Sequence, residues 1–443
     1  MLSGNLMAYA IHARAQLKKL AIVMTRILTG GKSASVRALL TDLSCNLGVA
    51  DASAVYDPQT DRIYVSCGYT EGPWASTGHV YALEDRGSRI ELKAVARLEQ
   101  PRWGAAASLN PLDGSLIFIG GHTEEGPSSV ITKFDPLSGE VQDVDVGVPI
   151  GRGCMADFVP EWCSILVAVE HPKRLFLIYD CKSGSVRTVR SPWPDIPTRW
   201  GNMTYYGSLI FITGGSVSRG RAIIRQPYMR VLRALEGLRL RLARSSVTPF
   251  ALHRMNREAV TYGGFILLGF GLDGLGKFHG QVLLYDASAD AYYWLGRART
   301  SRDGVASAFD FKVGRAYFIG GRNSRSEPKG LTEVTVVDLR SEPVDAQLWA
   351  EPCGDNRYAV LSSGETPKLH LRLANQLDRE VSVEVVVLRG GEALSKRVLE
   401  LSASEITHET FKLDRPGLYS VLVSGDERDF AIRTNVIRVV RLQ

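Results

Sequence analysis

The chain has 443 residues, of which 45% are apolar and 23% charged, and its formal net charge is +6. This composition is typical of a folded globular protein and excludes an intrinsically disordered one. The length suffices for two or three domains or for one large repeat array. No run of eighteen apolar residues occurs, as a membrane-spanning helix requires. The six cysteines are scattered without a Cys-x-x-Cys pair, which argues against a zinc knuckle or a thioredoxin-type site.

The N-terminal segment carries an apolar stripe with alternating steps of four and three residues, made of Leu6, Ala10, Ala13, Leu17, Leu20, Met24 and Ile27. This spacing predicts an amphipathic helix, which with its linker covers residues 1–33. We expect the helix to dock against the body of the protein or against a partner. We expect a cytoplasmic protein, with secretion by a signal peptide or attachment to a membrane surface through residues 5–28 as the alternatives.

A short apolar run ending in a glycine pair occurs twice, as SLIFIGG at residues 115–121 and as SLIFITGG at residues 208–215. Related runs end near residues 68, 170, 271 and 321, so the six copies recur about every fifty residues. Such a period indicates a repeat array such as a propeller. The apolar strands and the turn residues between them predict four short strands in each copy.

Two further series follow the same period. Apolar strands end in aspartate at Asp85, Asp135, Asp180, Asp286 and Asp338. An arginine precedes five of the runs, at Arg102, Arg152, Arg199, Arg257 and Arg302. The aspartate of one copy is missing near residue 233, where two alternating strands flank Glu236–Gly237 and predict a tight hairpin.

Six four-stranded sheets bury their faces when they pack radially against one another. We therefore predict an all-β protein with a six-bladed propeller over residues 34–352, in which residues 35–43 are a candidate for an extra strand of the last blade. The arginine, the glycine pair and the aspartate strand together resemble the kelch repeat of the galactose-oxidase-like superfamily. Two tryptophans, Trp294 and Trp349, match the outer-strand tryptophan of that repeat.

The pattern changes after the ring. Residues 353–443 contain seven short alternating strands without glycine pairs, which resemble an immunoglobulin-like sandwich. A propeller followed by a sandwich also resembles the copper radical oxidases, but the Tyr-His pair of those enzymes is absent. GFGLDG, at residues 269–274, continues a β-meander and predicts turns rather than a dinucleotide site. We assign no catalytic residue, no metal site and no cofactor.

Propeller geometry places the five arginines at one mouth of the central channel, because the first strand of each blade is innermost. The predicted ligand-binding residues are Arg102, Arg152, Arg199, Arg257, Arg302, Arg322, His122, His171, Trp103 and Trp200. Converging guanidinium groups favour a carboxylate or phosphate ligand. The resemblance implies the same, since kelch domains that bind acidic peptides use arginines at matching positions. The alternative is that these arginines brace neighbouring blades.

A second basic region predicts a partner surface formed by Arg219, Arg221, Arg225, Arg230, Arg233, Arg239, Arg241 and Arg244. An acidic protein partner, a nucleic-acid backbone and a charged edge that blocks aggregation are the three interpretations.

The sequence thus favours a non-enzymatic binding or scaffold protein that captures an acidic protein partner or an anionic ligand at the channel mouth. Two alternatives stay open. A six-bladed kelch ring also resembles the sialic-acid mutarotases, for which His253 and Glu258 are the available candidate residues. A nucleic-acid or ribonucleoprotein subunit is the second alternative.

Overall fold

The structure is a computed structural model. It describes residues 35–441 except for 73–74, 170–173, 190–195, 197–198, 220–221, 226–227, 249–251, 255–260, 263–264, 274, 288, 327, 352–355, 362–364, 414 and 426–429. The described part of the chain is all-β, as predicted, and its one helical element is a short 3-10 helix, η1 (Pro160–Trp162). The helix predicted within residues 1–33 lies outside the described residues.

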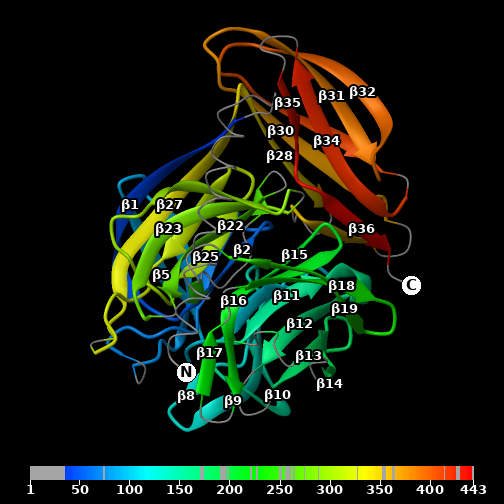
Figure 1. Ribbon diagram of the computed structural model, residues 1–443. Helices are drawn as coiled ribbons and strands as arrows, with labels where there is room; N and C mark the ends of the chain where they lie inside the picture. The colour runs from blue at the N-terminus through cyan, green and yellow to red at the C-terminus, as the bar shows by residue number, and fades with distance from the viewer. Residues whose placement is uncertain are drawn as a thin grey trace, which may run out of the picture.

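Six four-stranded antiparallel meanders form a ring (Figure 1). Within each of these blades, the strands are named in order from the innermost to the outermost. Blade 1 contains β2 (Ser53–Asp57), β3 (Arg62–Ser66), β4 (His79–Asp85) and β5 (Arg89–Arg97). Blade 2 contains β6 (Ala106–Leu109), β7 (Leu116–Ile119), β9 (Gly126–Phe134) and β10 (Val141–Ile150), with β8 (His122–Thr123) paired to β9. Blade 3 contains β11 (Met155–Val159), β12 (Ser164–Val169), β13 (Leu175–Asp180) and β14 (Val186–Val189).

The other three blades repeat this order. Blade 4 contains β15 (Arg199–Tyr206), β16 (Leu209–Arg219), β18 (Tyr228–Leu235) and β19 (Arg239–Val247), with β17 (Ala222–Arg225) paired to β16. Blade 5 contains β20 (Leu252–Arg254), β22 (Phe265–Asp273), β23 (Phe278–Asp286) and β24 (Ala291–Arg297), with β21 (Thr261–Tyr262) paired to β22. Blade 6 contains β25 (Ala306–Asp310), β26 (Arg315–Ile319), β27 (Leu331–Glu342) and β1 (Ser35–Val49). The predicted hairpin at Glu236–Gly237 is confirmed as the turn between β18 and β19.

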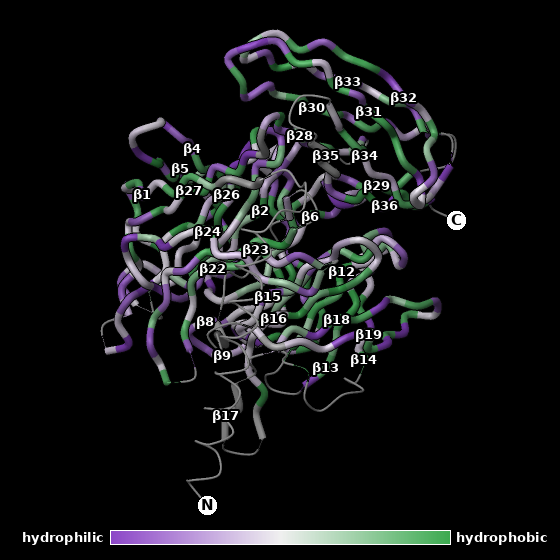
Figure 2. The backbone as a smooth tube through the Cα atoms, turned by 45° about the horizontal axis from the view of Figure 1, so that its top comes forward, coloured by the Kyte–Doolittle hydropathy of each residue, from purple (hydrophilic) through white to green (hydrophobic). Residues whose placement is uncertain are grey.

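The inner strands close the ring. The strand β2 contacts both β6 and β25, and contacts continue from β6 to β11, to β15 and to β20. Blades 5 and 6 meet through ring contacts of Tyr262 with Phe309 and of Phe270 with Phe318. The strands are mostly hydrophobic stretches separated by hydrophilic turns (Figure 2). The predicted six-bladed propeller is therefore present.

The outer strand of the last blade comes from the start of the described chain. The strand β1 pairs antiparallel with β27 from Ser35, opposite Glu342, to Ser44, opposite Glu333. It also pairs briefly with β5, so blades 1 and 6 form one eight-stranded sheet. The prediction that residues 35–43 add a strand to the last blade is confirmed, and β1 lies along β27 in Figure 1.

The glycine pairs mark places where the outermost strand of the same blade approaches the end of its second strand. Gly120 has φ 61°, and a Cβ atom there would lie 2.5 Å from the carbonyl oxygen of Ile150 in the outermost strand of its own blade. At the equivalent Gly320, with φ 60°, a Cβ atom would overlap the carbonyl oxygen of Val49. A larger residue at these positions is excluded by both backbone conformation and space.

The C-terminal unit is a two-sheet β-sandwich. One sheet contains β28 (Val344–Glu351), β30 (Lys368–Asn375) and β33 (Ile406–Lys412). The other contains β29 (Tyr358–Leu361), β36 (Ile437–Arg441), β34 (Gly417–Gly425), β31 (Val381–Arg389), β32 (Glu392–Leu401) and β35 (Phe430–Arg433). The expected boundary at residue 353 is too late, because β28 pairs with β30. The outer strand of blade 6 is β1. Trp349 therefore lies in β28 of the sandwich and not in an outer strand of the ring.

The sandwich covers the end of the ring at which the inner strands finish (Figure 1). Arg357, just before β29, forms a buried ion pair with Asp157 of β11. The ring of Tyr358 packs on Phe158 at 4.9 Å, and the hydroxyl of Tyr262 donates to Asp345 at 2.7 Å. These contacts fix the sandwich on blades 3 and 5.

We expect Arg357→Ala to lower the free energy of unfolding by roughly 3 kcal/mol, because the carboxylate of Asp157 would stay buried without its cationic partner. Urea unfolding measures the effect. Arg340→Ala is the control, since Arg340 pairs with Asp338 while half exposed and its loss should cost less than about 1 kcal/mol. Equal losses of stability for the two substitutions would contradict the conclusion that the ion pair of Arg357 with Asp157 holds the sandwich on the ring.

Alkaline pH should destabilise the fold. Burial and nearby carboxylates raise the pKa of Tyr56, Tyr205 and Tyr317 above that of an unfolded tyrosine. A raised folded-state pKa contributes stability that is complete below pH 10 and is lost as the pH rises further, because the unfolded state releases the proton first. Absorbance of phenolate should therefore show tyrosines that titrate only together with unfolding. Titration of every tyrosine near pH 10 in the folded protein would contradict this.

Candidate functional site

The channel mouth opposite the sandwich is framed by a chain of main-chain hydrogen bonds between blades. The amide of Asp51 donates to Gly304 at 2.8 Å, Gly104 donates to Asp51 at 2.9 Å, Gly153 donates to Gly104 at 2.7 Å and Trp200 donates to Gly153 at 2.7 Å. Each residue lies two positions before the inner strand of its blade or at the matching place in β15. We call these five residues the main-chain belt.

All five belt residues have positive φ, from 48° at Asp51 to 75° at Gly153. Glycine adopts this conformation without steric cost, whereas other residues lose roughly 1–2 kcal/mol. Three of the five are glycine, so Asp51 and Trp200 are the exceptions. Gly153 must be glycine for a further reason, because a Cβ atom there would lie within 2.5 Å of the indole of Trp200.

The belt defines which residues are equivalent between blades. Arg102 and Arg302 lie two residues before the belt, whereas Arg152 and Arg199 lie one residue before it. The four described arginines of the series that precedes the apolar runs therefore occupy two different positions relative to the belt. The residue just before the belt, called here the rim position, is Ala50, Trp103, Arg152, Arg199 or Asp303 in the five blades.

Arg102 is a structural brace. Its side chain is fully buried, and its Nε donates to the carbonyl of Gly120 at 2.8 Å. Its Nη2 reaches the carbonyl of Phe118 at 3.3 Å and the hydroxyl of Thr132 at 2.6 Å. Arg102 thus joins the strands of its own blade and does not face the channel mouth as a ligand group.

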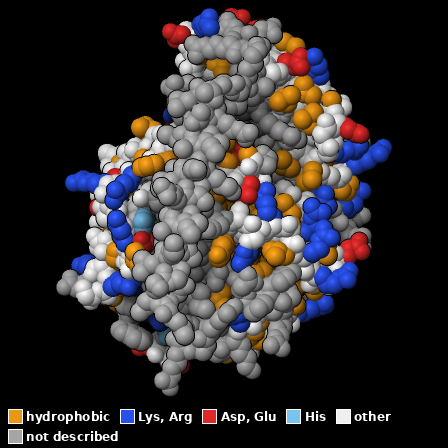
Figure 3. Space-filling view, viewed as in Figure 1, with side chains coloured by type: hydrophobic (Ala, Val, Ile, Leu, Met, Phe, Trp, Pro, Cys, Tyr) orange, Lys and Arg blue, Asp and Glu red, His pale blue; other side chains and the backbone are white. Residues whose placement is uncertain are grey.

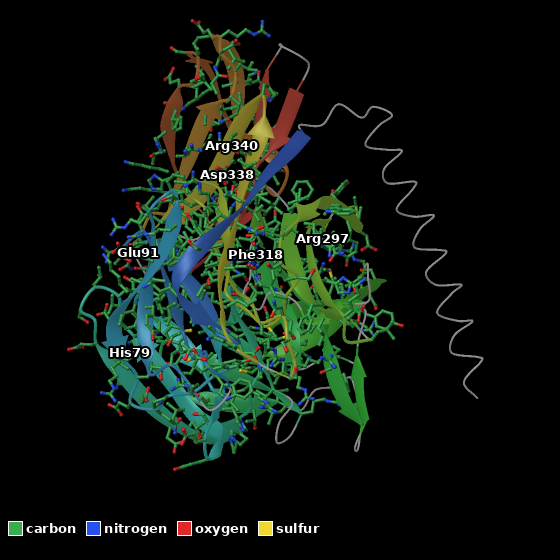
Figure 4. The ribbon with its side chains drawn as sticks, turned by 90° about the vertical axis from the view of Figure 1, so that its left-hand side faces the viewer. His79, Glu91, Arg297, Phe318, Asp338 and Arg340 are labelled. Atoms are coloured by element: carbon green, nitrogen blue, oxygen red, sulfur yellow. The ribbon has the colours of Figure 1, made fainter. Side chains whose placement is uncertain are left out.

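Arg302 repeats this arrangement in blade 6. Its Nη2 donates to the carbonyl of Phe318 at 3.1 Å and to the hydroxyl of Thr335 at 2.9 Å, and burial lowers its pKa to about 10. Phe318 lies in the interior of the ring (Figure 4). The guanidinium also lies 4.4 Å over the ring of Phe270. In both blades the threonine donates in turn to an aspartate of the outer strand, Asp143 in β10 or Asp42 in β1.

Arg322 reaches the mouth but is ion-paired. Its Nε donates to Asp303 at 2.9 Å, and its Nη1 lies 3.1 Å from the hydroxyl of Tyr69 and 4.0 Å from Asp51. Burial alone would lower the pKa of Arg322, but the carboxylates of Asp51 and Asp303 raise it above the ordinary value. Sequence reasoning missed Tyr69 and Asp51, although Tyr69 follows its strand at the same place as His122.

Arg152 differs from the braces because it is exposed. Its guanidinium lies 4.6 Å over the indole of Trp103, which is 3% exposed. The Trp103 ring contacts Tyr69 at 5.6 Å and His122 at 5.8 Å, both edge-on. The indole Nε1 of Trp103 is buried and has no hydrogen-bond partner in the described part of the chain.

Arg199 is half-buried at the start of β15, and its Nε donates to the hydroxyl of Ser216 at 3.3 Å. The half-buried indole of Trp200 packs against the cluster of Ala50, Tyr69 and Trp103. Arg152, Arg199 and the two tryptophans therefore lie together at the mouth. The predicted residues Arg257 and His171 lie outside the described residues.

The opposite end of the channel holds a small polar cavity. It has a volume of about 60 Å³, room for about four water molecules. Its lining includes Asp157 and Thr261 from the inner strands and Asn356 and Arg357 from the segment that leads to the sandwich. The cavity is too small for a sugar ring, so we place the candidate site at the belt end.

The second predicted basic region divides into three groups. Arg230 and Arg244 are held internally, Arg230 by Ser245 and Arg244 by the hydroxyl of Tyr285 at 2.7 Å. Arg233, Arg239 and Arg241 are exposed on the hairpin of β18 and β19. The side chains of Arg219, Arg221 and Arg225 lie outside the described part.

Among the described residues, no group of three or more His, Cys, Asp or Glu side chains is arranged to hold a metal ion. No helix in the same part of the chain is long and apolar enough to cross a membrane. No protein-family model matches the sequence, and no curated protein matches it significantly.

Arg102→Ala should lower the free energy of unfolding by roughly 3 kcal/mol, because several buried oxygens lose a charged donor. Arg152→Ala should cost less than about 1 kcal/mol, because an exposed cation on an aromatic ring contributes only modestly. Chemical denaturation of both variants checks the contrast. Similar losses for the two arginines would refute the distinction between brace and rim.

Proposed function

We propose that this protein is a binding module that captures an acidic protein partner, or a smaller anionic ligand, at the channel mouth through Arg152 and Arg199. The observation that carries the proposal is the exposed guanidinium of Arg152, stacked on the buried indole of Trp103. Stacking orients the plane of the guanidinium, and the planar set of N–H donors of an arginine matches the geometry of a carboxylate or phosphate. Arg199 adds a second positive charge from the next blade.

The backbone of Trp200 supports a role in binding. It holds a left-handed conformation in a position where three other blades have glycine. Such strain persists where the side chain has a use that offsets the cost. The indole packs against the cluster that contains Trp103, and it lies next to Gly153, the residue that follows Arg152.

The charge distribution at the mouth is consistent with this proposal. The carboxylates of Asp51 and Asp303 lie on the side of blades 1 and 6, where Arg322 balances part of their charge. Arg152 and Arg199 belong to blades 3 and 4. An anion approaching the mouth is therefore attracted to blades 3 and 4 rather than to the acidic side.

The fold type is part of the proposal. The glycine pairs, the arginine braces and the six meanders support a kelch-type ring, and the two packed sheets support an immunoglobulin-like sandwich. No observation favours the acidic-sugar enzyme, since Glu258 lies outside the described residues and His253 is described only as backbone of β20. The ribonucleoprotein alternative has no support at the channel mouth.

The double substitution Arg152→Ala with Arg199→Ala should weaken binding of an acidic tetrapeptide at least tenfold, because each lost charge-assisted hydrogen bond contributes about 1.5–3 kcal/mol. Fluorescence anisotropy with a labelled Asp-Glu-Asp-Glu peptide measures the affinity, and citrate serves as a small competing anion. Thermal unfolding should change little.

Arg86→Ala with Arg89→Ala is the matched control, because it removes the same charge from the outer hairpin of blade 1. This control should leave the affinity unchanged. The proposal fails if the control weakens binding as much as the test variant, or if neither the peptide nor citrate binds. It also fails if the test variant loses as much stability as we expect for Arg102→Ala.

A further inference from the structure

The outer hairpin of blade 4 carries positive charge that its own blade does not balance. The strand β19 ends the order of its sheet and, among the described strands, pairs only with β18. Its outer main-chain N–H and C=O groups therefore face no described strand. Lys and Arg side chains gather on the side of the molecule where Figure 1 places β18 and β19 (Figure 3).

The register of the hairpin places like charges together. Arg233 lies directly opposite Arg241, and Arg239 lies opposite Leu235. All three arginines are exposed. Directly opposed like charges destabilise an antiparallel pair. The pairing of Arg233 with Arg241 is therefore unfavourable in the isolated protein.

No carboxylate in the described part of the chain forms an ion pair with Arg233, Arg239 or Arg241. The turn residue Glu236 contributes its carbonyl oxygen, which accepts a hydrogen bond from Nε of Arg239 at 3.1 Å. The other described arginines of the hairpin have internal roles, as shown for Arg230 and Arg244. The three exposed arginines thus form a separate group, named here the blade-4 arginine edge.

The matching hairpin of blade 1 is built differently. There Arg89 pairs with Glu91, Lys93 pairs with Glu84 at 2.8 Å, and Arg86 lies between the same two acids. Glu91 is on the outer side of this blade (Figure 4). Unbalanced charge is therefore not a general property of the outer hairpins. A charged edge that only blocks aggregation does not need opposed arginines either.

The features of the edge fit an extended acidic peptide. Arg239 and Arg241 are two residues apart, so their side chains are about 7 Å apart, which matches alternate residues of a neighbouring strand. Leu242 is 39% exposed beside them and offers an apolar contact. A nucleic acid fits less well, because the aromatic Tyr228 is covered by the guanidinium of Arg230 at 4.7 Å and offers no base-stacking surface.

We propose that the blade-4 arginine edge binds an acidic peptide segment of a partner protein, which adds to β19 as a fifth strand and places its carboxylates against Arg233, Arg239 and Arg241. Main-chain hydrogen bonds to the open edge supply affinity, and the arginines select for acidic side chains. This surface lies on the outer wall of the ring and does not depend on the channel mouth.

A labelled ten-residue peptide of alternating Glu and Val tests the proposal on the full-length protein in 0.15 M salt, where the Debye length is about 8 Å. We expect saturable binding in fluorescence anisotropy. The variant R233E/R239E/R241E should weaken this binding at least tenfold. R233Q/R239Q/R241Q should weaken it as well, which guards against an effect of the reversed charge on folding.

The matched control R86E/R89E/K93E makes the same change in net charge on the outer hairpin of blade 1 and should leave the affinity within twofold. A peptide methylated on alternate backbone nitrogens should lose binding, because strand addition needs those N–H groups. The proposal is overturned if R86E/R89E/K93E weakens binding as much as R233E/R239E/R241E does, or if the methylated peptide binds as well as the unmethylated one. It is also overturned if a ten-nucleotide single-stranded DNA binds as tightly, or if no saturable binding occurs.

Discussion

The main-chain belt around the channel mouth is the constraint on which the rest of the structure depends. In the described part of the chain, its hydrogen bonds connect five of the six blades through one backbone position, which has positive φ in each of them. Because the belt fixes where each inner strand begins, it also fixes the direction of every neighbouring side chain. An arginine two residues before the belt points into its blade, and an arginine one residue before it reaches the mouth.

The same residue type therefore has two roles in one ring. Arg102 and Arg302 donate hydrogen bonds to carbonyl oxygens inside their blades. Because both side chains are fully buried, these bonds stabilise the fold. Arg152 and Arg199 lie one residue before the belt, where Arg152 is exposed and Arg199 is half-buried at the channel mouth. The outer hairpin of blade 4 shows a similar division, in which Arg230 and Arg244 are held internally and their neighbours are exposed.

Much of the fold follows from the sequence, because glycine pairs, aspartate strands and their fifty-residue period report local backbone requirements. The sequence also indicated the closing strand at residues 35–43. The site was less predictable. Arg-Trp-Gly occurs at both 102–104 and 199–201, and only the belt, which passes through Gly104 but through Trp200, shows that the two arginines differ by one position. The pairing of β28 with β30 and the ion pair of Arg357 depend on contacts between distant segments, which no local pattern reports.

The origin of β1 has a consequence for how the protein reaches its native state. This strand lies at the beginning of the described chain, and its partner β27 is nearly three hundred residues later. During synthesis, the last blade therefore stays incomplete until almost the whole ring has left the ribosome. Contacts this distant in sequence slow folding and make it concerted. The ring therefore gains its full stability only when its two ends meet.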